Sequence, residues 1–207
     1  MFGLGRQKPP TAADRDTWLV AGLGNPGPGY AGNRHNVGQM VLDVVASRFG
    51  ARLSRHRSTT MLAETRLRPG GPKLVLVKPL SYMNTSGGPV SAAAQYFGIA
   101  PDRVIVIHDD LDLPFETLRL KSGGGHGGQN GVRDIIKALG TPDFLRVRVG
   151  IGRPPGQQSA ADYVLRDFPA SERAQLPFVL DEAADAIERI IDDGLVAAQQ
   201  RHHAPKA

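Results

Sequence analysis

The side chains of this chain that can do chemistry are imidazole, carboxylate and amide groups, because its 207 residues include no cysteine. His35 lies just before a predicted helix, and an acidic run at residues 108–112 ends a predicted strand. A carboxylate that binds one nitrogen of a histidine fixes the ring's tautomer and leaves the other nitrogen free to take a proton from water. This pattern predicts hydrolysis by a histidine-activated water.

The same acidic run allows a second interpretation, a metal site built from His108, Asp109, Asp110 and Asp112. Adjacent side chains on a strand point to opposite faces, so only alternate members of the run can converge. A hard cation remains an alternative, whereas no zinc-binding pattern is present. We favour one carboxylate that orients one histidine.

The segment GLGNPG at residues 22–27 matches the dinucleotide fingerprint letter for letter. That fingerprint works only where a helix opens inside it, so that the N-terminus of the helix faces the pyrophosphate. Here Pro26 and the residues up to 32 keep the chain irregular until about Asn36. We therefore interpret the segment as a rigid turn that presents the Asn25 amide, which has one acceptor and two donors.

Two further segments have a composition that a simple turn does not require. Tyr82, Met83 and Asn84 follow a strand, and an aromatic ring, a thioether and an amide together suit a peptide or a base. The glycine-rich stretch 123–131 precedes a helix, where backbone N–H groups can approach an anion closely. Lys121 and Arg148 would supply charge for a phosphate there.

Alternating strands and helices must position these groups. We expect strands at 17–23, 74–77, 104–107, 117–121 and 145–151 and helices at 37–49, 86–97, 132–139 and 176–190. Ser86 is the expected N-cap of the second helix. This order predicts an α/β sheet covered on both faces, with ligands beyond the carboxyl ends of its strands, where three of the polar clusters begin.

Composition predicts one catalytic domain at residues 17–195, a flexible arm at 1–16 and a tail at 196–207. The net charge is +5, with the basic surplus in residues 1–161 and an acidic surplus in 162–195. A basic body is compatible with a nucleic-acid partner. Absence of cysteine, of a signal peptide and of an apolar run of ~18 residues favours a cytoplasmic protein without a membrane span.

Taken together, the motifs resemble the bacterial-type peptidyl-tRNA hydrolase family. The matching pieces are GLGNPGPGY, RHNVG, KPLSYMNTSG, HDDLDLP, LKSGGGHGGQNG and FLRVRVGIGRP, which run in family order from about Trp18 to Pro155. The resemblance implies a monomeric, single-domain α/β fold with a twisted mixed sheet flanked by helices on both faces. It also implies hydrolysis of the ester between a peptide and the 3' end of tRNA, with no metal, no organic cofactor, no membrane and no obligate protein partner.

The resemblance further implies a role for each matching residue. His35 would activate water, Asp109 would hold its ring, and Asn25 would bind near the scissile ester. The substrate's peptide would be bound by Asn84 and Asn130, with Met83 lining the site and Tyr30 flanking it. Lys121 and Arg148 would clamp the tRNA 5' phosphate.

The chain departs from the family pattern at two positions. Gln129 stands where histidine is usual, and it cannot titrate near neutral pH. Asp110 stands where glutamate is commoner, and we expect it to face away from Asp109. The alternatives to a hydrolase are an RNA-binding protein that keeps this fold without hydrolysis and a nucleotide-dependent oxidoreductase.

Overall fold

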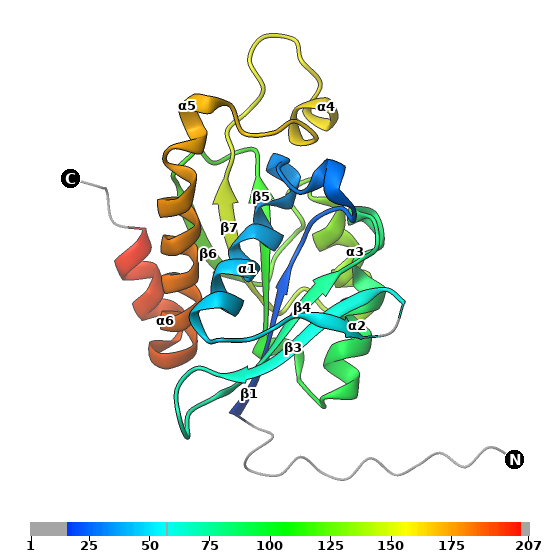
Figure 1. Cartoon of the computed structure of the whole chain (residues 1–207), viewed down its shortest axis with the longest axis vertical. Coiled ribbons are helices and arrows are strands. Elements are labelled where there is room, and N and C mark those ends of the chain that lie inside the picture. The colour runs from blue at the N-terminus through cyan, green and yellow to red at the C-terminus, as the bar shows by residue number, and fades with distance from the viewer. Residues whose placement is uncertain (1–15, 57, 204–207) are drawn as a thin grey trace, which may run out of the picture.

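The computed structural model describes residues 16–56 and 58–203, and a seven-stranded mixed sheet forms its centre (Figure 1). The strand order is β2-β3-β4-β1-β5-β7-β6. Neighbouring strands are parallel through the four central members, β4 (Lys73–Pro79), β1 (Thr17–Gly22), β5 (Val104–Asp110) and β7 (Leu145–Gly150). The outer strands run antiparallel to their neighbours, namely β2 (Ser54–His56), β3 (Thr60–Arg66) and β6 (Leu118–Ser122). The predicted mixed α/β sheet is confirmed.

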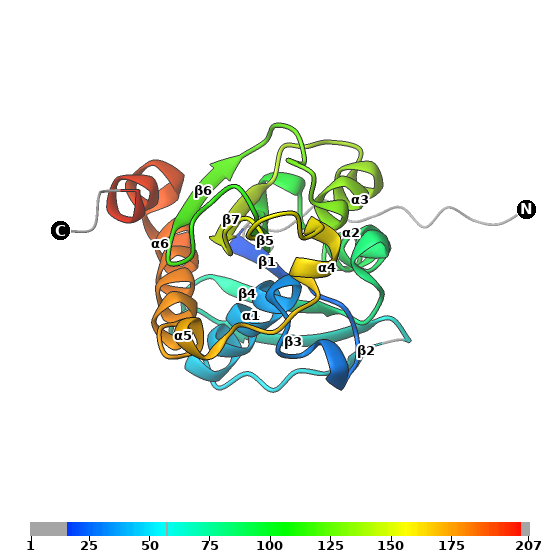
Figure 2. The ribbon, with the colours of Figure 1, turned by 90° about the horizontal axis from the view of Figure 1, so that it is seen from above.

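Helices cover both faces of this sheet (Figure 2). One face carries α1 (Val37–Arg48) and α6 (Leu176–His202), and the other carries α2 (Gly87–Tyr96) and α3 (Asn130–Leu139). Alternate residues of β5 feed two separate cores, with Ile105 and Ile107 in one and Val106 in the other. None of the helices in residues 16–56 and 58–203 combines the length and apolar character that a membrane crossing requires.

The chain changes direction across the sheet at β1. From β1 it passes through α1 to the strands on one side, and from β4 it returns through α2 to β5 on the other side. Such a switch point opens a crevice beyond the carboxyl ends of the strands. Asn25 follows β1, Met83 follows β4 and Asp109 lies near the end of β5, so three predicted site residues meet at this crevice.

Two glycines let α1 lie directly on the sheet. A Cβ atom on Gly22 would lie 2.4 Å from the carbonyl oxygen of Gly38, and one on Gly38 would lie 2.3 Å from the carbonyl oxygen of Ile107. Any larger residue at either position would push the helix away from β1 and β5. This close contact fixes the start of α1, and with it the 3-10 turn η3 (Arg34–Asn36) that carries His35.

The C-terminal region differs from the prediction. The chain beyond 195, expected to be a tail, continues as α6 to His202 after a kink at Gly194, whose φ is 84°. Gln199 Nε2 donates to the carbonyl oxygen of Leu120 (2.9 Å), and the Leu120 N–H donates to Nε2 of His203 (2.8 Å). These side chains occupy the outer edge of β6. Residues 1–15 of the predicted arm and 204–207 lie outside the described residues.

The predicted cap of α2 is wrong. Ser86 adopts a helical conformation within the turn that precedes α2, and its hydroxyl donates to the carbonyl oxygen of Met83 (2.9 Å) instead of accepting from the helix. The Gly87 N–H donates to the Asp134 carboxylate of α3 (2.7 Å). A negative charge at a helix N-terminus is favourable, so one helix caps the other.

Candidate active site

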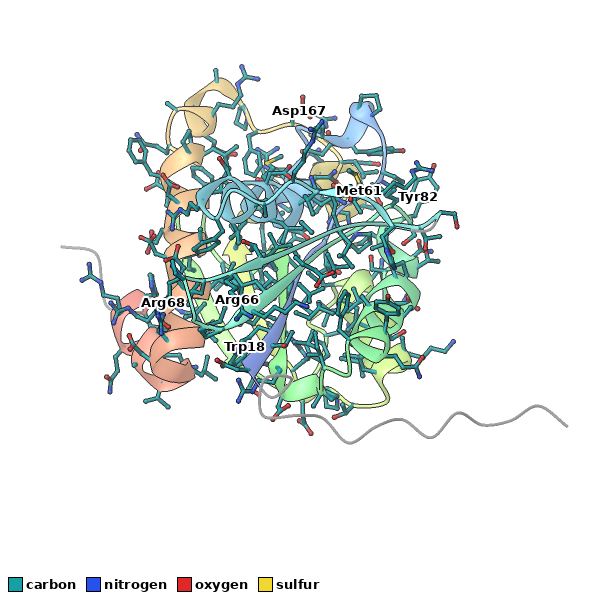
Figure 3. The ribbon with its side chains drawn as sticks, turned by 60° about the horizontal axis from the view of Figure 1, so that its bottom comes forward. Trp18, Met61, Arg66, Arg68, Tyr82 and Asp167 are labelled. Carbon is teal, nitrogen blue, oxygen red and sulfur yellow. The ribbon has the colours of Figure 1, made fainter. Side chains whose placement is uncertain are left out.

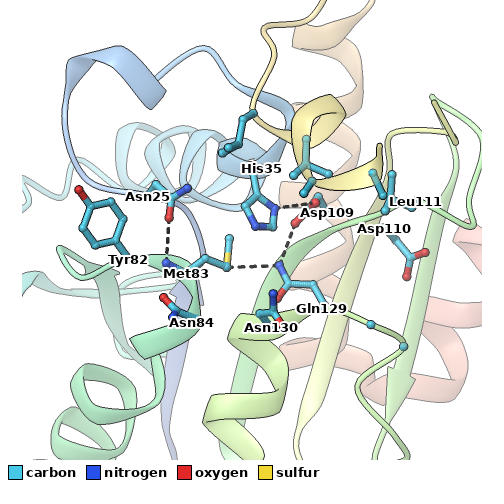
Figure 4. A pocket seen from close by; sticks show the side chains of 16 residues that line it. Asn25, His35, Tyr82, Met83, Asn84, Asp109, Asp110, Leu111, Gln129 and Asn130 are labelled. Carbon is cyan, nitrogen blue, oxygen red and sulfur yellow. Dashed lines mark hydrogen bonds and ion pairs between the residues drawn. The ribbon is translucent and has the colours of Figure 1, made fainter. Parts of the chain in front are cut away.

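A cleft of about 570 Å³ opens at the carboxyl ends of β1, β4 and β5 (Figure 4). It is lined by Asn25, His35, Tyr82, Met83, Asn84, Asp109, Asp110, Leu111, Gly127, Gly128, Gln129, Asn130, Ala160, Ala161, Val164 and Leu165. The predicted catalytic and peptide-binding residues gather here, apart from Tyr30. Tyr30, Lys121 and Arg148 lie outside the lining.

His35 and Asp109 form the pair that the sequence predicts. His35 Nδ1 lies 2.9 Å from Oδ2 of Asp109, whose side chain is only 3% exposed. Because the ionised carboxylate can only accept, Nδ1 carries the proton of the neutral ring. The lone pair therefore lies on Nε2, the nitrogen that is free to take a proton from a molecule in the cleft.

The surroundings of His35 raise its pKa above the ordinary 6.5. Burial is the largest single influence and lowers the pKa, but the charge of Asp109 and its hydrogen bond together outweigh it. His35 is thus a stronger base than a free histidine, and it becomes neutral only at a higher pH.

Asn25 presents a donor to the same cleft. Its Oδ1 accepts a hydrogen bond from the backbone N–H of Met83 (2.8 Å), which fixes the orientation of the amide. The opposite end, Nδ2, has no partner among the described residues. A fixed donor of this kind suits an oxygen that gains negative charge during a reaction.

Asn36 is a residue beside the site that the sequence pattern does not single out. Its Oδ1 accepts from the backbone N–H of Asn25, and its Nδ2 donates to the backbone carbonyl of Asn25, both at 2.9 Å. Asn36 is 2% exposed and directly follows His35. An amide beside the predicted base was the available signal, but its partner could not be inferred from the sequence.

Met83, Asn84 and Asn130 form the part of the cleft that Figure 4 shows opposite His35. Met83 is 4% exposed and opens the turn η4 (Met83–Thr85), while Asn130 is the first residue of α3. Tyr82 is 58% exposed at the mouth. Tyr30 packs against it edge to face, with ring centroids 6.4 Å apart, and so flanks the site through Tyr82.

Gln129 lines the cleft as well. The sequence singles it out only as a departure from a family pattern, yet its Nε2 lies 2.9 Å from Oδ1 of Asp109. It is also the N-cap residue of α3, which begins at Asn130 rather than at the predicted 132. The helix therefore starts inside the segment that the sequence assigns to the glycine-rich loop.

An apolar wall closes the side of the cleft formed by α4 (Ala160–Val164). Arg34, another residue that was missed, fastens the following segment: its guanidinium donates to the carbonyl oxygen of Asp167 (2.9 Å) and to Glu172 (3.0 Å). It also lies 4.2 Å from the centre of the Tyr163 ring. Figure 3 places Asp167 at the opposite end of the molecule from Trp18 of β1.

Lys121 and Arg148 lie on β6 and β7, whose polar faces meet beside the glycine-rich loop. Burial, and then the charges of Arg146 and Arg148, lower the pKa of Lys121, and the strand register places Arg119 on the same face. Arg146 was missed; it donates to the carbonyl oxygens of Gly124 and Gly125, each at 2.7 Å, and so orders the loop. A cluster of this kind favours an anion.

Asp110 faces away from Asp109, as the alternation of the strand predicts. Its carboxylate accepts from Nε of Arg148 (2.7 Å), on the other face of β5.

Within residues 16–56 and 58–203, no three histidine, aspartate or glutamate side chains are arranged to hold a metal ion.

The chain is similar to known proteins over most of its length. A family model described as peptidyl-tRNA hydrolase matches residues 19–207. Peptidyl-tRNA hydrolase of Paenarthrobacter aurescens (strain TC1) is 61% identical over 192 residues, which cover 93% of this chain and 99% of that relative. The protein of the same name from Frankia alni is 60% identical over 191 residues, covering 92% and 96%. The crystal structure of peptidyl-tRNA hydrolase from Acinetobacter baumannii is similar with a TM-score of 0.85 at 33% identity, covering 93% of this chain and 97% of that one.

Proposed function

The chain belongs to the peptidyl-tRNA hydrolase family, and on that premise we propose that His35 is the general base of its reaction. The substrate is peptidyl-tRNA, and the bond to be broken is the ester between the peptide and the 3' end of the tRNA. One observation carries the proposal. His35 Nδ1 is held 2.9 Å from Asp109, so Nε2 is left as the basic atom in a cleft that Asn25 also lines.

The chemistry needs only groups of this chain and water. As the oxygen of a water molecule forms a bond to the ester carbonyl carbon, Nε2 of His35 takes a proton from that water. Asp109 stabilises the imidazolium that results, and Asn25 Nδ2 donates to the developing oxyanion. When the carbon–oxygen bond to the ribose breaks, the imidazolium returns its proton to the 3' oxygen. The products are a free tRNA and a peptide carboxylic acid, which loses its remaining proton to the solvent.

The peptide part of the substrate would bind along the side of the cleft opposite His35. Asn84 and Asn130 each offer an amide, which can pair with both the N–H and the C=O groups of a peptide backbone. Met83 and the ring pair Tyr30 and Tyr82 add apolar contact that adapts to different side chains. Such contacts suit a substrate whose peptide sequence varies.

The tRNA part would be held by its 5' phosphate between Lys121 and Arg148. Burial and then the neighbouring cations lower the pKa of Lys121, and a bound phosphate would offset the repulsion between these cations. Arg148 would then share its guanidinium between Asp110 and the phosphate. Phosphate contacts give affinity without reading sequence, as an enzyme acting on many tRNAs requires.

The remaining expectations are part of the same proposal. The catalytic unit begins at residue 17, includes α6 to its end at His202, acts as a monomer in the cytoplasm, and needs neither a metal nor an organic cofactor. The absence of cysteine from the whole chain supports the cytoplasmic assignment.

Hydrolysis of a purified peptidyl-tRNA by the wild-type chain and by His35→Ala tests the assignment of the base. We expect His35→Ala to lose almost all turnover and to keep most of its affinity for tRNA. His56→Ala is the matched control, because His56 lies on β2, away from the cleft, and packs against Tyr96. Turnover of His35→Ala at the wild-type rate would contradict the proposal.

A further inference from the structure

The orientation of the Gln129 amide is determined by the helix that it caps. Its Oε1 accepts hydrogen bonds from the backbone N–H groups of Gly131 (2.6 Å) and Val132 (3.2 Å). Only the oxygen end of an amide can accept, so these two donors fix which end faces the helix. The nitrogen end must then point away from α3.

The nitrogen end of the Gln129 amide contacts the carboxylate of Asp109. Gln129 Nε2 lies 2.9 Å from Oδ1 of Asp109, and Oδ2 of the same carboxylate lies 2.9 Å from His35 Nδ1. Both oxygens of a buried side chain are therefore engaged, one by the base and one by an amide. Gln129 Nε2 also lies 3.3 Å from the sulfur of Met83. The side chain of Gln129 therefore contacts the N-terminus of α3, the Asp109 carboxylate and Met83.

We propose that Gln129 is a positioning residue for the His35–Asp109 pair, and that it supplies Asp109 with a hydrogen bond that no change of pH near neutrality removes. An amide neither gains nor loses a proton in this range, so its donor is always present. The hydrogen bond from Gln129 Nε2 to Oδ1 fixes the plane of the carboxylate. Asp109 can then hold the imidazole in one orientation through the whole reaction. This inference rests on the proposed function, since it concerns the same base.

The other charged groups near Asp109 are directed elsewhere. Asp110 pairs with Arg148 on the opposite face of β5, and Nδ1 of His108 donates to the backbone carbonyl oxygen of Asp109. Arg146 of β7 binds the loop carbonyls, and His126 of the glycine-rich loop accepts from the Gly128 N–H. α4 contributes only alanine and valine side chains to the cleft, and Leu165, which directly follows α4, adds another apolar one. Gln129 and His35 are therefore the partners of the Asp109 carboxylate oxygens.

Gln129→Asn separates this role from helix capping. Asparagine is among the best N-cap residues, so α3 keeps its cap, but the side chain is one methylene too short to reach Asp109. We expect kcat to fall by about 10- to 100-fold, the range for losing a hydrogen bond to a charged group, with KM nearly unchanged. A folded Gln129→Asn variant with wild-type kcat would show that Gln129 only caps the helix and would overturn the inference.

Gln129→Glu provides a second readout that does not depend on turnover. The glutamate can still accept from the helix, but it replaces the donor with a negative charge beside Asp109. The pKa of His35, followed by NMR titration of the folded protein, is then expected to rise above the wild-type value. An unchanged titration midpoint would overturn the inference.

The two proposals fail in different ways. If His35→Ala retains turnover, the proposed function is wrong whatever Gln129 does. If His35→Ala is inactive while Gln129→Asn and Gln129→Glu match the wild type in kcat and in the titration of His35, the proposed function stands and only the role of Gln129 is wrong.

Discussion

Asn36 holds Asn25 by both of its backbone polar groups, through two hydrogen bonds of 2.9 Å. The residue immediately before it, His35, pairs with Asp109, and the one before that, Arg34, fastens the segment beyond α4. Three consecutive residues thus connect three different parts of the site. Displacement of the η3 turn would disturb the base, the donor and the apolar wall together.

The contact between Asn36 and Asn25 predicts an effect of Asn36→Asp. The aspartate keeps an acceptor for the Asn25 N–H but loses the donor to its carbonyl, and it adds a buried charge. We expect kcat to fall by about tenfold or more through misplacement of Asn25, with a smaller change in KM. Steady-state kinetics check this, with circular dichroism to confirm that the variant is folded. A change in KM alone would contradict the positioning role.

Asp109→Asn tests the electrostatic part of the dyad. Asp109 raises the pKa of His35, so the acidic limb of the kcat/KM profile should lie above the ordinary 6.5 in the wild type and move to lower pH in the variant. The rate at the optimum should fall by about 10²- to 10⁴-fold, because the amide no longer stabilises the imidazolium. A pH–rate profile measures both effects. An acidic limb at the same pH in the wild type and in Asp109→Asn would mean that a group other than His35 titrates there.

The phosphate clamp predicts a salt effect. Replacing Lys121 or Arg148 with alanine should raise KM for peptidyl-tRNA and reduce the slope of log affinity against log salt by about one, while kcat changes less. Lys137→Ala is the control, since Lys137 is an exposed cation on α3. If the salt slopes of the Lys121 and Arg148 variants equal that of Lys137→Ala, the phosphate binds elsewhere.

Gly38→Ala tests the close packing of α1. The added methyl group would lie 2.3 Å from the Ile107 carbonyl oxygen, so we expect the free energy of unfolding to fall by about 1–3 kcal/mol or more. Gly88→Ala, in α2, is the matched control, because its Cβ meets open space and alanine favours a helix. Urea denaturation compares the two. A Gly38→Ala variant as stable as Gly88→Ala would show that α1 can shift without cost.

Much of the fold follows from local pattern. Continuous apolar runs predicted β1, β4 and β5, because these strands are buried on both faces. Strands β2 and β3 were missed, since the sequence TMLAETR at residues 60–66 shows no regular alternation and its burial is irregular too. Their place in the sheet is set by pairing with β4, which the local sequence does not report.

The sequence predicts those parts of the site in which a residue type has one evident chemical role. His35, with a carboxylate at the end of a distant strand, is such a case. The roles of Asn36, Arg146 and Gln129 were not predictable, because each depends on which end of a side chain meets a group far away in the sequence. The apparent cap at Ser86 failed for the same reason: the competing carboxylate comes from α3.

The covering of β6 by the end of α6 bears on self-association. Gln199 and His203 satisfy the carbonyl and the N–H of Leu120 in place of a neighbouring strand. An open strand edge is a template for pairing with a second copy of the chain, and removal of the segment after Gly194 would create one. The side chains at the end of α6 therefore block the pairing of a second strand at Leu120.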